Sequence, residues 1–169
     1  MTLTIQWQSS IVDELTVLDV ATEFATLRLH LSGDVIQKSA WLLTPGDSLN
    51  QPLAQSIKRY LENPDDLRLT VNLQKQGTSF SNRVWLELVK IPFAETLTYT
   101  QLAKRLGSGA RAVANACKNN PFPGIIPCHR VVSANGIGGF MGQRQGEFVE
   151  LKRRILCYES SMRERHASQ

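Results

Sequence analysis

The strongest constraint on the fold is a change in hydrophobic period near residue 76. Upstream of it, apolar and polar residues alternate, which predicts strands. This alternation is clearest in residues 3–7, 27–31 and 67–73. Downstream, apolar residues recur every three or four positions, which predicts helices. Because residues 74–78 form a polar linker between the two patterns, we expect an α+β protein with domains 1–76 and 77–169.

One helix interrupts the strands of the first domain. Pro52 favours the first turn of a helix, and the apolar residues that follow it share one face. These residues are Leu53, Ile57, Tyr60 and Leu61. The segment 63–66 then breaks the helix. We expect a small antiparallel sheet with this helix packed on it, and the domain contains no catalytic cluster.

The second domain contains the outline of a helix-turn-helix. A first helix carries Phe80, Val84 and Leu88 on one face and stops before Pro92. Thr98 can cap a short helix over residues 99–106, and the glycine-containing turn 107–109 leads to another helix over 110–119. Two short helices joined by such a turn are typical of DNA-binding domains.

Charge divides unevenly between the two halves of this 169-residue chain. Residues 1–76 hold six Lys and Arg against nine Asp and Glu, giving −3, whereas residues 77–169 hold thirteen against six, giving +7. A basic half favours a polyanionic partner, although solvated surface charge is an alternative. No apolar run reaches about 18 residues, so we expect no membrane span. No basic residue precedes Arg28, so we expect no secretory signal, and three cysteines are too few for a disulfide scaffold.

Cys128 is the residue most suggestive of chemistry. It lies in Pro127-Cys128-His129-Arg130-Val131, where Pro127 restricts the backbone before the thiol. A free thiol with a pKa of ~8.5 is mostly protonated at neutral pH, and an adjacent imidazole or cation would activate it. The alternative interpretation is a small buried hydrophobic residue, because free cysteine is often buried and inert.

Two other residues have both a functional and a structural interpretation. Arg111 begins a helix of small residues, which suits close contact with a DNA minor groove and equally suits an alanine-rich helix packed on the core. Glu159 continues the apolar stripe of Leu151 and Ile155 at four-residue intervals. A carboxylate on a buried face needs a partner, unless the helix frays there and leaves Glu159 in water.

Together these segments resemble the O6-alkylguanine-DNA alkyltransferases. The resemblance covers roughly residues 77–159, and its Pro-Cys-His-Arg-Val core is highly specific. The matching segments are Leu97 to Ala103, Arg111-Ala112-Val113, Asn120-Pro121, Ile125 to Val132, Gly136, Gly139-Phe140 and the final helix reaching Glu159. The first domain carries no matching motif, and its pattern is compatible with the family's small ribonuclease-H-like domain. The resemblance also implies a mainly helical, winged-helix-like second domain.

The resemblance implies an enzyme of DNA repair that acts once. Cys128 would accept an alkyl group, typically methyl, from guanine O6 in duplex DNA, and the thioether would be permanent. His129 would take the thiol proton through a water, and Glu159 would orient the imidazole. Tyr99 would stabilise the leaving guanine, although a tyrosine there is equally common core filling. Asn120 would organise the turn beneath Cys128.

The resemblance implies further residues that contact the DNA. Arg111 would replace the extruded base in the stack, since chemistry on a base inside a duplex requires base flipping. Tyr99, Thr100, Ala112 and Ala114 would lie on the same DNA-binding surface. Phe140 would pack against the flipped guanine, and Val131 and Met141 would complete the pocket.

The chain departs from the family's usual pattern in several places. The turn before Arg111 is shorter by about two residues. Phe140 stands where tyrosine is common, Met141 where a small polar residue is common, and residues 143–150 form a rearranged connection. Some relatives bind zinc through cysteines of the first domain, but this chain has none before Cys117, so we expect no metal. We also expect no cofactor, a monomer, a cytoplasmic and nucleoid-associated location, and core positions for Cys117 and Cys157.

Two rival functions are open to test. A non-catalytic binder of alkylated DNA would use the same helix-turn-helix but would lack the acceptor cysteine, which is present here. A cysteine hydrolase would use the Cys-His pair on an ester or amide and would be indifferent to DNA. Neither accounts for Arg111 and Cys128 together.

Overall fold

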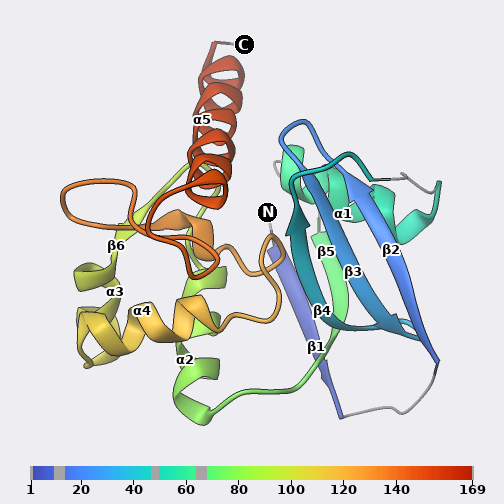
Figure 1. Cartoon of the computed structure of the whole chain (residues 1–169), viewed down its shortest axis with the longest axis horizontal. Coiled ribbons are helices and arrows are strands. Elements are labelled where there is room, and N and C mark those ends of the chain that lie inside the picture. Colours follow the sequence, from blue (N-terminus) through green and yellow to red (C-terminus); the bar gives the residue numbers. More distant parts are fainter. Residues whose placement is uncertain (1, 10–13, 47–49, 64–67, 169) are drawn as a thin grey trace. The chain divides into compact units, whose positions relative to one another are not determined.

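A computed structural model describes residues 2–9, 14–46, 50–63 and 68–168, and it divides the chain into two units (Figure 1). The first unit consists of residues 1–76 together with 121–125. The second consists of residues 77–120 and 126–169. A division by sequence at residue 76 assigns segment 121–125 to the second domain, whereas its contacts are with the first unit. The chain therefore leaves the second unit after Asn120 and re-enters it at Ile126.

The first unit is built on one five-stranded mixed sheet. Its strands are β1 (Thr2–Gln8), β2 (Leu15–Ala21), β3 (Thr26–Ser32), β4 (Val35–Leu42) and β5 (Arg68–Gln74). Their order across the sheet is β1-β5-β4-β3-β2. β2, β3 and β4 form an antiparallel meander, while β5 pairs in parallel with both β1 and β4.

The expectation of a purely antiparallel sheet is therefore wrong. Parallel neighbours need a crossover connection, and α1 (Pro52–Glu62) supplies it between β4 and β5. Figure 1 shows α1 lying across one face of the sheet. The alternation in residues 3–7 and 27–31 correctly located β1 and β3, and the third segment located β5 apart from Leu67, which lies outside the described residues. β2 and β4 were not predicted, because Asp19 and Ser39 interrupt their apolar patterns.

Segment 121–125 is held on the first unit by specific contacts. The Ser39 amide donates to the Pro121 carbonyl at 2.9 Å, and the Ser39 hydroxyl donates to the Pro123 carbonyl at 2.8 Å. The Tyr60 hydroxyl donates to the Ile125 carbonyl at 3.0 Å. Since buried carbonyls need partners, these donors allow irregular backbone to be buried here.

The second unit contains most of the helices. They are α2 (Ser79–Val89), α3 (Tyr99–Leu106), α4 (Ala110–Lys118) and α5 (Glu147–Ala167), with a short 3-10 turn, η2, at Cys128–Arg130. Strands β6 (Leu97–Thr98) and β7 (Val131–Val132) pair in parallel. The Trp85 indole is buried and donates to the Ala116 carbonyl at 2.9 Å, which joins α2 to α4.

The helix-turn-helix expected from the sequence corresponds to α3 and α4. Thr98 caps α3 through a reciprocal capping box with Gln101. Gly107 ends α3 in the left-handed conformation at φ 62°, which glycine adopts without a Cβ penalty. The small residues of α4 divide between two faces, with Val113, Ala116 and Cys117 buried.

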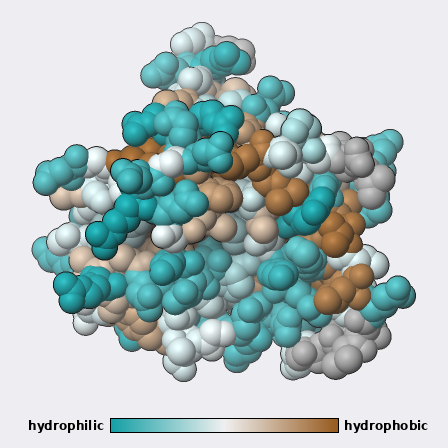
Figure 2. Space-filling view, viewed as in Figure 1, coloured by the Kyte–Doolittle hydropathy of each residue, from teal (hydrophilic) through white to brown (hydrophobic). Residues whose placement is uncertain are grey.

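Polar residues dominate the surface. Figure 2 shows hydrophilic side chains over most of the face in view, with smaller apolar areas among them. No helix in the described part of the chain is long and apolar enough to cross a membrane.

Gly124 provides a test of how tightly segment 121–125 packs on the first unit. It has φ +86°, and an added Cβ would lie 3.0 Å from both the Leu27 and Trp41 side chains. We expect Gly124→Ala to lower the free energy of unfolding by roughly 1–3 kcal/mol, because it adds overpacking to backbone strain. Chemical denaturation measures this change.

Gly33→Ala is the matched control. Gly33 also has positive φ, +60°, but nothing lies within 4 Å of an added Cβ. The decrease in the free energy of unfolding of Gly33→Ala therefore reports backbone strain alone. Equal losses in the two variants would contradict close packing at Gly124.

Candidate active site

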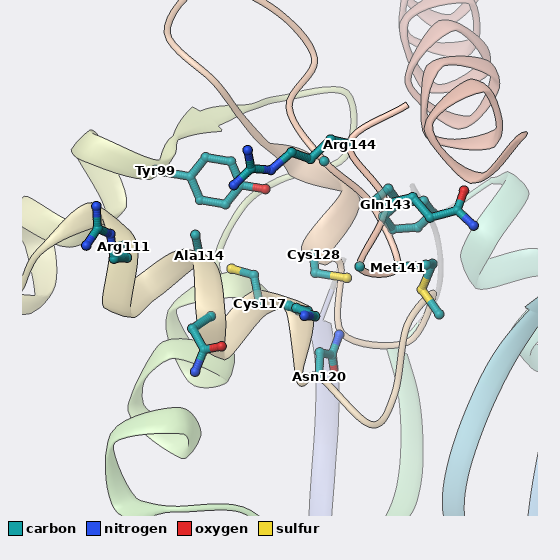
Figure 3. A pocket seen from close by; sticks show the side chains of 14 residues that line it. Tyr99, Arg111, Ala114, Cys117, Asn120, Cys128, Met141, Gln143 and Arg144 are labelled. Carbon is teal, nitrogen blue, oxygen red and sulfur yellow. The ribbon is translucent and has the colours of Figure 1, made fainter. Parts of the chain in front are cut away.

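Cys128 lies at the wall of a pocket formed within the second unit. The pocket has a volume of about 350 Å³, and Figure 3 shows the side chains around it. The η2 turn presents the thiol: the Cys128 amide donates to the Ile126 carbonyl at 2.8 Å, and the Arg130 amide donates to the Pro127 carbonyl at 3.1 Å. The cavity is of the size that small-molecule sites usually have.

The Cys128 thiol is buried, with 7% of the residue exposed. Burial raises its pKa, while a hydrogen bond from Asn120 and the charge of Lys152 act in the opposite direction. Asn120 is itself fixed, because its side-chain amide donates to the Ile126 carbonyl at 2.9 Å. The net upward shift keeps the resting thiol protonated at neutral pH, so a reaction at this sulfur requires a base.

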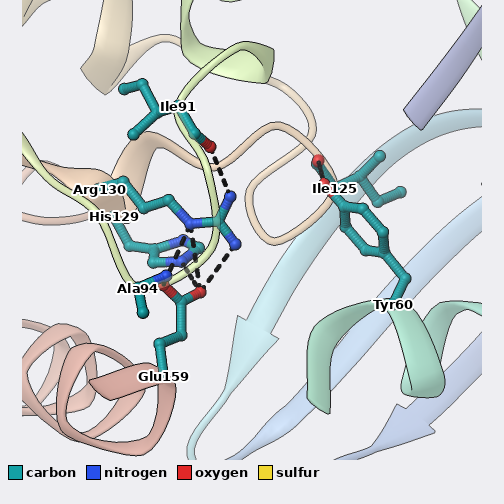
Figure 4. Close-up of polar contacts among 7 residues, drawn as sticks. All are labelled: Tyr60, Ile91, Ala94, Ile125, His129, Arg130 and Glu159. Atoms are coloured by element: carbon teal, nitrogen blue, oxygen red, sulfur yellow. Dashed lines mark hydrogen bonds and ion pairs between the residues drawn. The ribbon is translucent and has the colours of Figure 1, made fainter. Parts of the chain in front are cut away.

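The next residue in the chain, His129, carries a buried imidazole that pairs with Glu159. Burial lowers its pKa more than the Glu159 carboxylate raises it, so the imidazole is neutral at pH 7. Its Nε2 lies 2.8 Å from Glu159 Oε1 (Figure 4). Since an ionised carboxylate can only accept, the proton is on Nε2, and Nδ1 carries the free lone pair. Nδ1 is buried and has no hydrogen-bond partner among the described residues.

Glu159 is fully enclosed rather than solvated, with 2% of the residue exposed. Besides His129, it accepts from the Arg130 guanidinium at 2.9 Å and from the Ala94 amide at 3.1 Å. Burial alone would raise its pKa, but the interactions with His129 and Arg130 outweigh burial and lower the pKa to about 2. The alternative in which the helix frays at Glu159 is therefore wrong, because α5 continues to Ala167.

Arg130 has a different role from the one that the sequence suggested. Its place in the motif predicts a cation beside the thiol, whereas its guanidinium binds Glu159, donates to the Ile91 carbonyl at 2.8 Å and lies 5.6 Å from the Phe93 ring centroid. In the sequence, Glu159 is 29 residues and Ile91 is 39 residues away from Arg130. No local pattern could reveal such a pairing.

Lys152 is a second buried cation, which the sequence analysis missed. Its ammonium donates to the Val131 carbonyl at 2.6 Å and to the Gly139 carbonyl at 3.0 Å. Burial lowers its pKa to about 8, against the opposing effect of Cys128. A signal was present: Lys152 lies seven residues before Glu159, which places both on one face of α5.

Tyr99 and Cys117 line the pocket, whereas Cys157 does not. Burial raises the pKa of Tyr99, which lines the pocket with its ring centroid 5.9 Å from the Lys152 ammonium. Cys117 also lines the pocket, and burial raises its pKa to about 12. Cys157 is exposed on α5, so its expected core position is wrong.

The pocket contains most of the residues singled out from sequence. Arg111, Ala114, Asn120, Phe140 and Met141 line it together with Tyr99 and Cys128. Val131 does not, because its side chain is fully buried and only its carbonyl serves the site, through Lys152. Thr100 and Ala112 are exposed and lie outside the pocket lining. The described residues contain no cluster of three or more His, Cys, Asp or Glu that could hold a metal ion.

Comparisons with known proteins match this region most strongly. Residues 79–161 match the family described as 6-O-methylguanine DNA methyltransferase, DNA binding domain. A probable methylated-DNA–protein-cysteine methyltransferase from Acanthamoeba polyphaga mimivirus is 42% identical over 50% of this chain and 58% of its own length. The Metallosphaera sedula methylated-DNA–protein-cysteine methyltransferase is 40% identical over 58% of this chain and 57% of its own length. The matched region thus spans less than two thirds of these curated relatives.

Solved structures match over more of the chain. Mycobacterium tuberculosis OGT in complex with DNA is 30% identical, with a TM-score of 0.68, over 86% of this chain and 92% of that one. A variant of the M. tuberculosis O6-methylguanine methyltransferase is also 30% identical, with a TM-score of 0.68, over 88% of this chain and 94% of that one. The α+β fold of this chain is the fold of these structures.

The low pKa of Glu159 predicts an acid-dependent contribution to stability. Its value is about 2 in the folded protein against an ordinary 4.5. The unfolded chain therefore binds a proton at higher pH than the folded chain, so the contribution is present above pH 4.5 and is lost as pH falls towards 2. We expect the stability advantage of the wild type over Glu159→Gln to shrink across this window, as measured by urea unfolding at several pH values.

Glu150→Gln provides the control, because Glu150 lies on the same helix with 62% of its side chain exposed. Its difference from the wild type is expected to change little over the same pH range. A constant difference for Glu159→Gln would contradict the depressed pKa.

Proposed function

Because the chain belongs to the 6-O-methylguanine DNA methyltransferase family, we propose that it repairs DNA by direct alkyl transfer. It moves an alkyl group, typically methyl, from guanine O6 in double-stranded DNA to Sγ of Cys128. The observation that carries this proposal is a buried thiol at the wall of a pocket of about 350 Å³, followed in the chain by a neutral histidine whose Nδ1 has no hydrogen-bond partner among the described residues. The relatives named above are methyltransferases of this class.

Transfer begins with removal of the thiol proton. His129 Nδ1 accepts it through one bridging water, and the imidazolium that forms is stabilised by Glu159 at 2.8 Å. The Lys152 ammonium and the Asn120 amide lower the energy of the thiolate. Arg130 keeps Glu159 ionised, so that the carboxylate stabilises the imidazolium without taking its proton.

The thiolate then attacks the alkyl carbon. An S–C bond forms as the C–O6 bond breaks, and the electron pair of the broken bond stays with guanine. Tyr99 donates a proton or hydrogen bond to the departing base, for which its raised pKa keeps the hydroxyl protonated beforehand. The thioether on Cys128 has no route back to a thiol, so each molecule acts once and needs no cofactor.

The α3–α4 pair forms the surface that binds the DNA. Arg111 fills the gap left by the extruded guanine, and Ala114 lets the duplex backbone approach α4 closely. Thr100 and Ala112 are exposed beside them and contribute contacts on the same surface. Phe140 and Met141 form the wall that the guanine packs against, and Asn120 fixes the turn below the thiol.

The remaining expectations concern architecture and cellular setting. We propose that the first domain, residues 1–76, is ribonuclease-H-like and serves as a scaffold, and that the second, residues 77–169, is winged-helix-like. The protein works as a monomer on duplex DNA bearing O6-alkylguanine, in the cytoplasm and on the nucleoid. Basic residues of the second half add non-specific affinity that weakens with salt.

Two rivals are less well supported. A non-catalytic binder of alkylated DNA has no use for an acceptor thiol with a base beside it. A cysteine hydrolase requires turnover and no DNA surface. Covalent modification of Cys128 distinguishes the proposed function from both.

The first prediction of the proposed function is a covalent adduct. After incubation with a duplex bearing one O6-methylguanine, we expect the Cys128 peptide to gain the mass of one methylene group, with stoichiometry near one. Peptide mapping by mass spectrometry measures it. Cys128→Ala abolishes transfer, whereas Cys157→Ser, which alters an exposed thiol outside the pocket, leaves it intact. An adduct on another residue would overturn the proposed acceptor.

The second prediction concerns the base. We expect His129→Ala to slow transfer about 10²-fold or more while changing DNA affinity little, because it removes proton transfer and leaves the α3–α4 surface unchanged. Rapid-quench kinetics and equilibrium DNA binding separate the two effects. A loss confined to binding would contradict the role of His129.

A further inference from the structure

The rim of the pocket carries cations on two different elements. Arg111 and Lys118 belong to α4, whereas Arg144 belongs to the loop between Phe140 and α5. Among the described residues that line the pocket, none is an aspartate or glutamate. The pocket lining therefore favours an anion, and the cations that would bind it come from two elements.

Arg144 differs from several other arginines of this unit in having no protein partner. Arg130, Arg153 and Arg163 each pair with a glutamate. Arg144 is exposed and has no hydrogen bond or ion pair to any residue in the described ranges. Figure 3 shows its side chain extending from the loop towards Tyr99.

The base of the Arg144 loop is fixed. Phe140 and Gln143 exchange two backbone hydrogen bonds of 2.9 Å, with Met141 at φ 51° and Gly142 at φ 78° between them. Two successive positive φ values define a tight turn of the I′ type, and Met141 adopts there a conformation that costs a non-glycine residue roughly 1–2 kcal/mol. Phe140 is buried, and Lys152 holds the preceding Gly139 carbonyl. Arg144 therefore projects from an anchored turn.

The anions that reach this rim are the phosphates of the strand that carries the extruded nucleotide. Its base enters the pocket, but its sugar and phosphates stay joined to the strand and remain at the mouth. Phosphate oxygens are the usual partners of unpaired surface arginines in DNA-binding proteins.

We propose that Arg144 binds a phosphate flanking the extruded nucleotide, and that it holds the strand from the loop after Phe140, separately from the contacts of α4. This inference rests on the proposed function. Arg144 is a positioning residue: it contacts the DNA backbone and takes no part in bond making at Cys128.

The test compares two substrates, a duplex bearing O6-methylguanine and the free base O6-methylguanine, which has no phosphate. We expect Arg144→Ala to slow transfer from the duplex about tenfold, to reduce the salt dependence of binding by about one phosphate contact, and to leave transfer from the free base unchanged. Arg144→Lys should recover most of the rate, since it restores the charge. Arg154→Ala removes an exposed arginine of α5 outside the pocket lining and should change duplex transfer less than twofold.

A neutral methylphosphonate, placed in turn on each side of the lesion, identifies the phosphate. At the contacted position the wild type and Arg144→Ala should react at equal rates. The inference is overturned if Arg144→Ala matches Arg154→Ala on the duplex, if it slows the free base equally, or if neither methylphosphonate removes the difference. A wild type that reacts with neither substrate would instead refute the proposed function itself.

Discussion

The buried carboxylate of Glu159 holds the geometry of the second unit together. It receives hydrogen bonds from His129, Arg130 and the Ala94 amide, so it joins α5, the η2 turn and the loop after α2. A buried ion is costly without such partners, and removing one partner of a buried pair typically costs about 3–5 kcal/mol. The loop adopts φ 59° at Ala94, a conformation unfavourable for alanine, and its amide reaches Glu159 from there. The orientation of His129 therefore depends on three separate parts of the chain.

Burial and neighbouring charges together determine which groups of the site are ionised. Glu159 stays ionised because Arg130 compensates it, while His129 stays neutral because burial outweighs the attraction of the carboxylate. Lys152 donates hydrogen bonds to two carbonyls, and its charge acts to lower the pKa of Cys128. The raised pKa of Cys128 keeps the resting thiol protonated at neutral pH. Burial of the thiol thus limits reaction to a ligand that enters the pocket.

Much of the second unit could be predicted from sequence, because its signals are local. The Thr98 cap, the Gly107 turn and the four-residue spacing of Leu151, Ile155 and Glu159 each act within one or two helical turns. The first unit was harder to predict. A parallel pairing such as that of β1 with β5 joins residues 66 positions apart, as Thr2 and Arg68 are, and no periodicity encodes it. The return of segment 121–125 to the first unit likewise depends on hydroxyl donors from Ser39 and Tyr60.

The sequence by itself determined the change from strands to helices near residue 76, the helix-turn-helix outline, the Pro-Cys-His-Arg-Val motif around Cys128 and the family to which that motif is similar, because these depend on residue type and short spacing. The tertiary structure decided which groups meet. In it Arg130 pairs with Glu159, Lys152 binds the Val131 carbonyl, and Cys117 rather than Val131 lines the pocket. The physical reason is that ionisation depends on burial and on partners distant in sequence, and only packing of the whole unit fixes both.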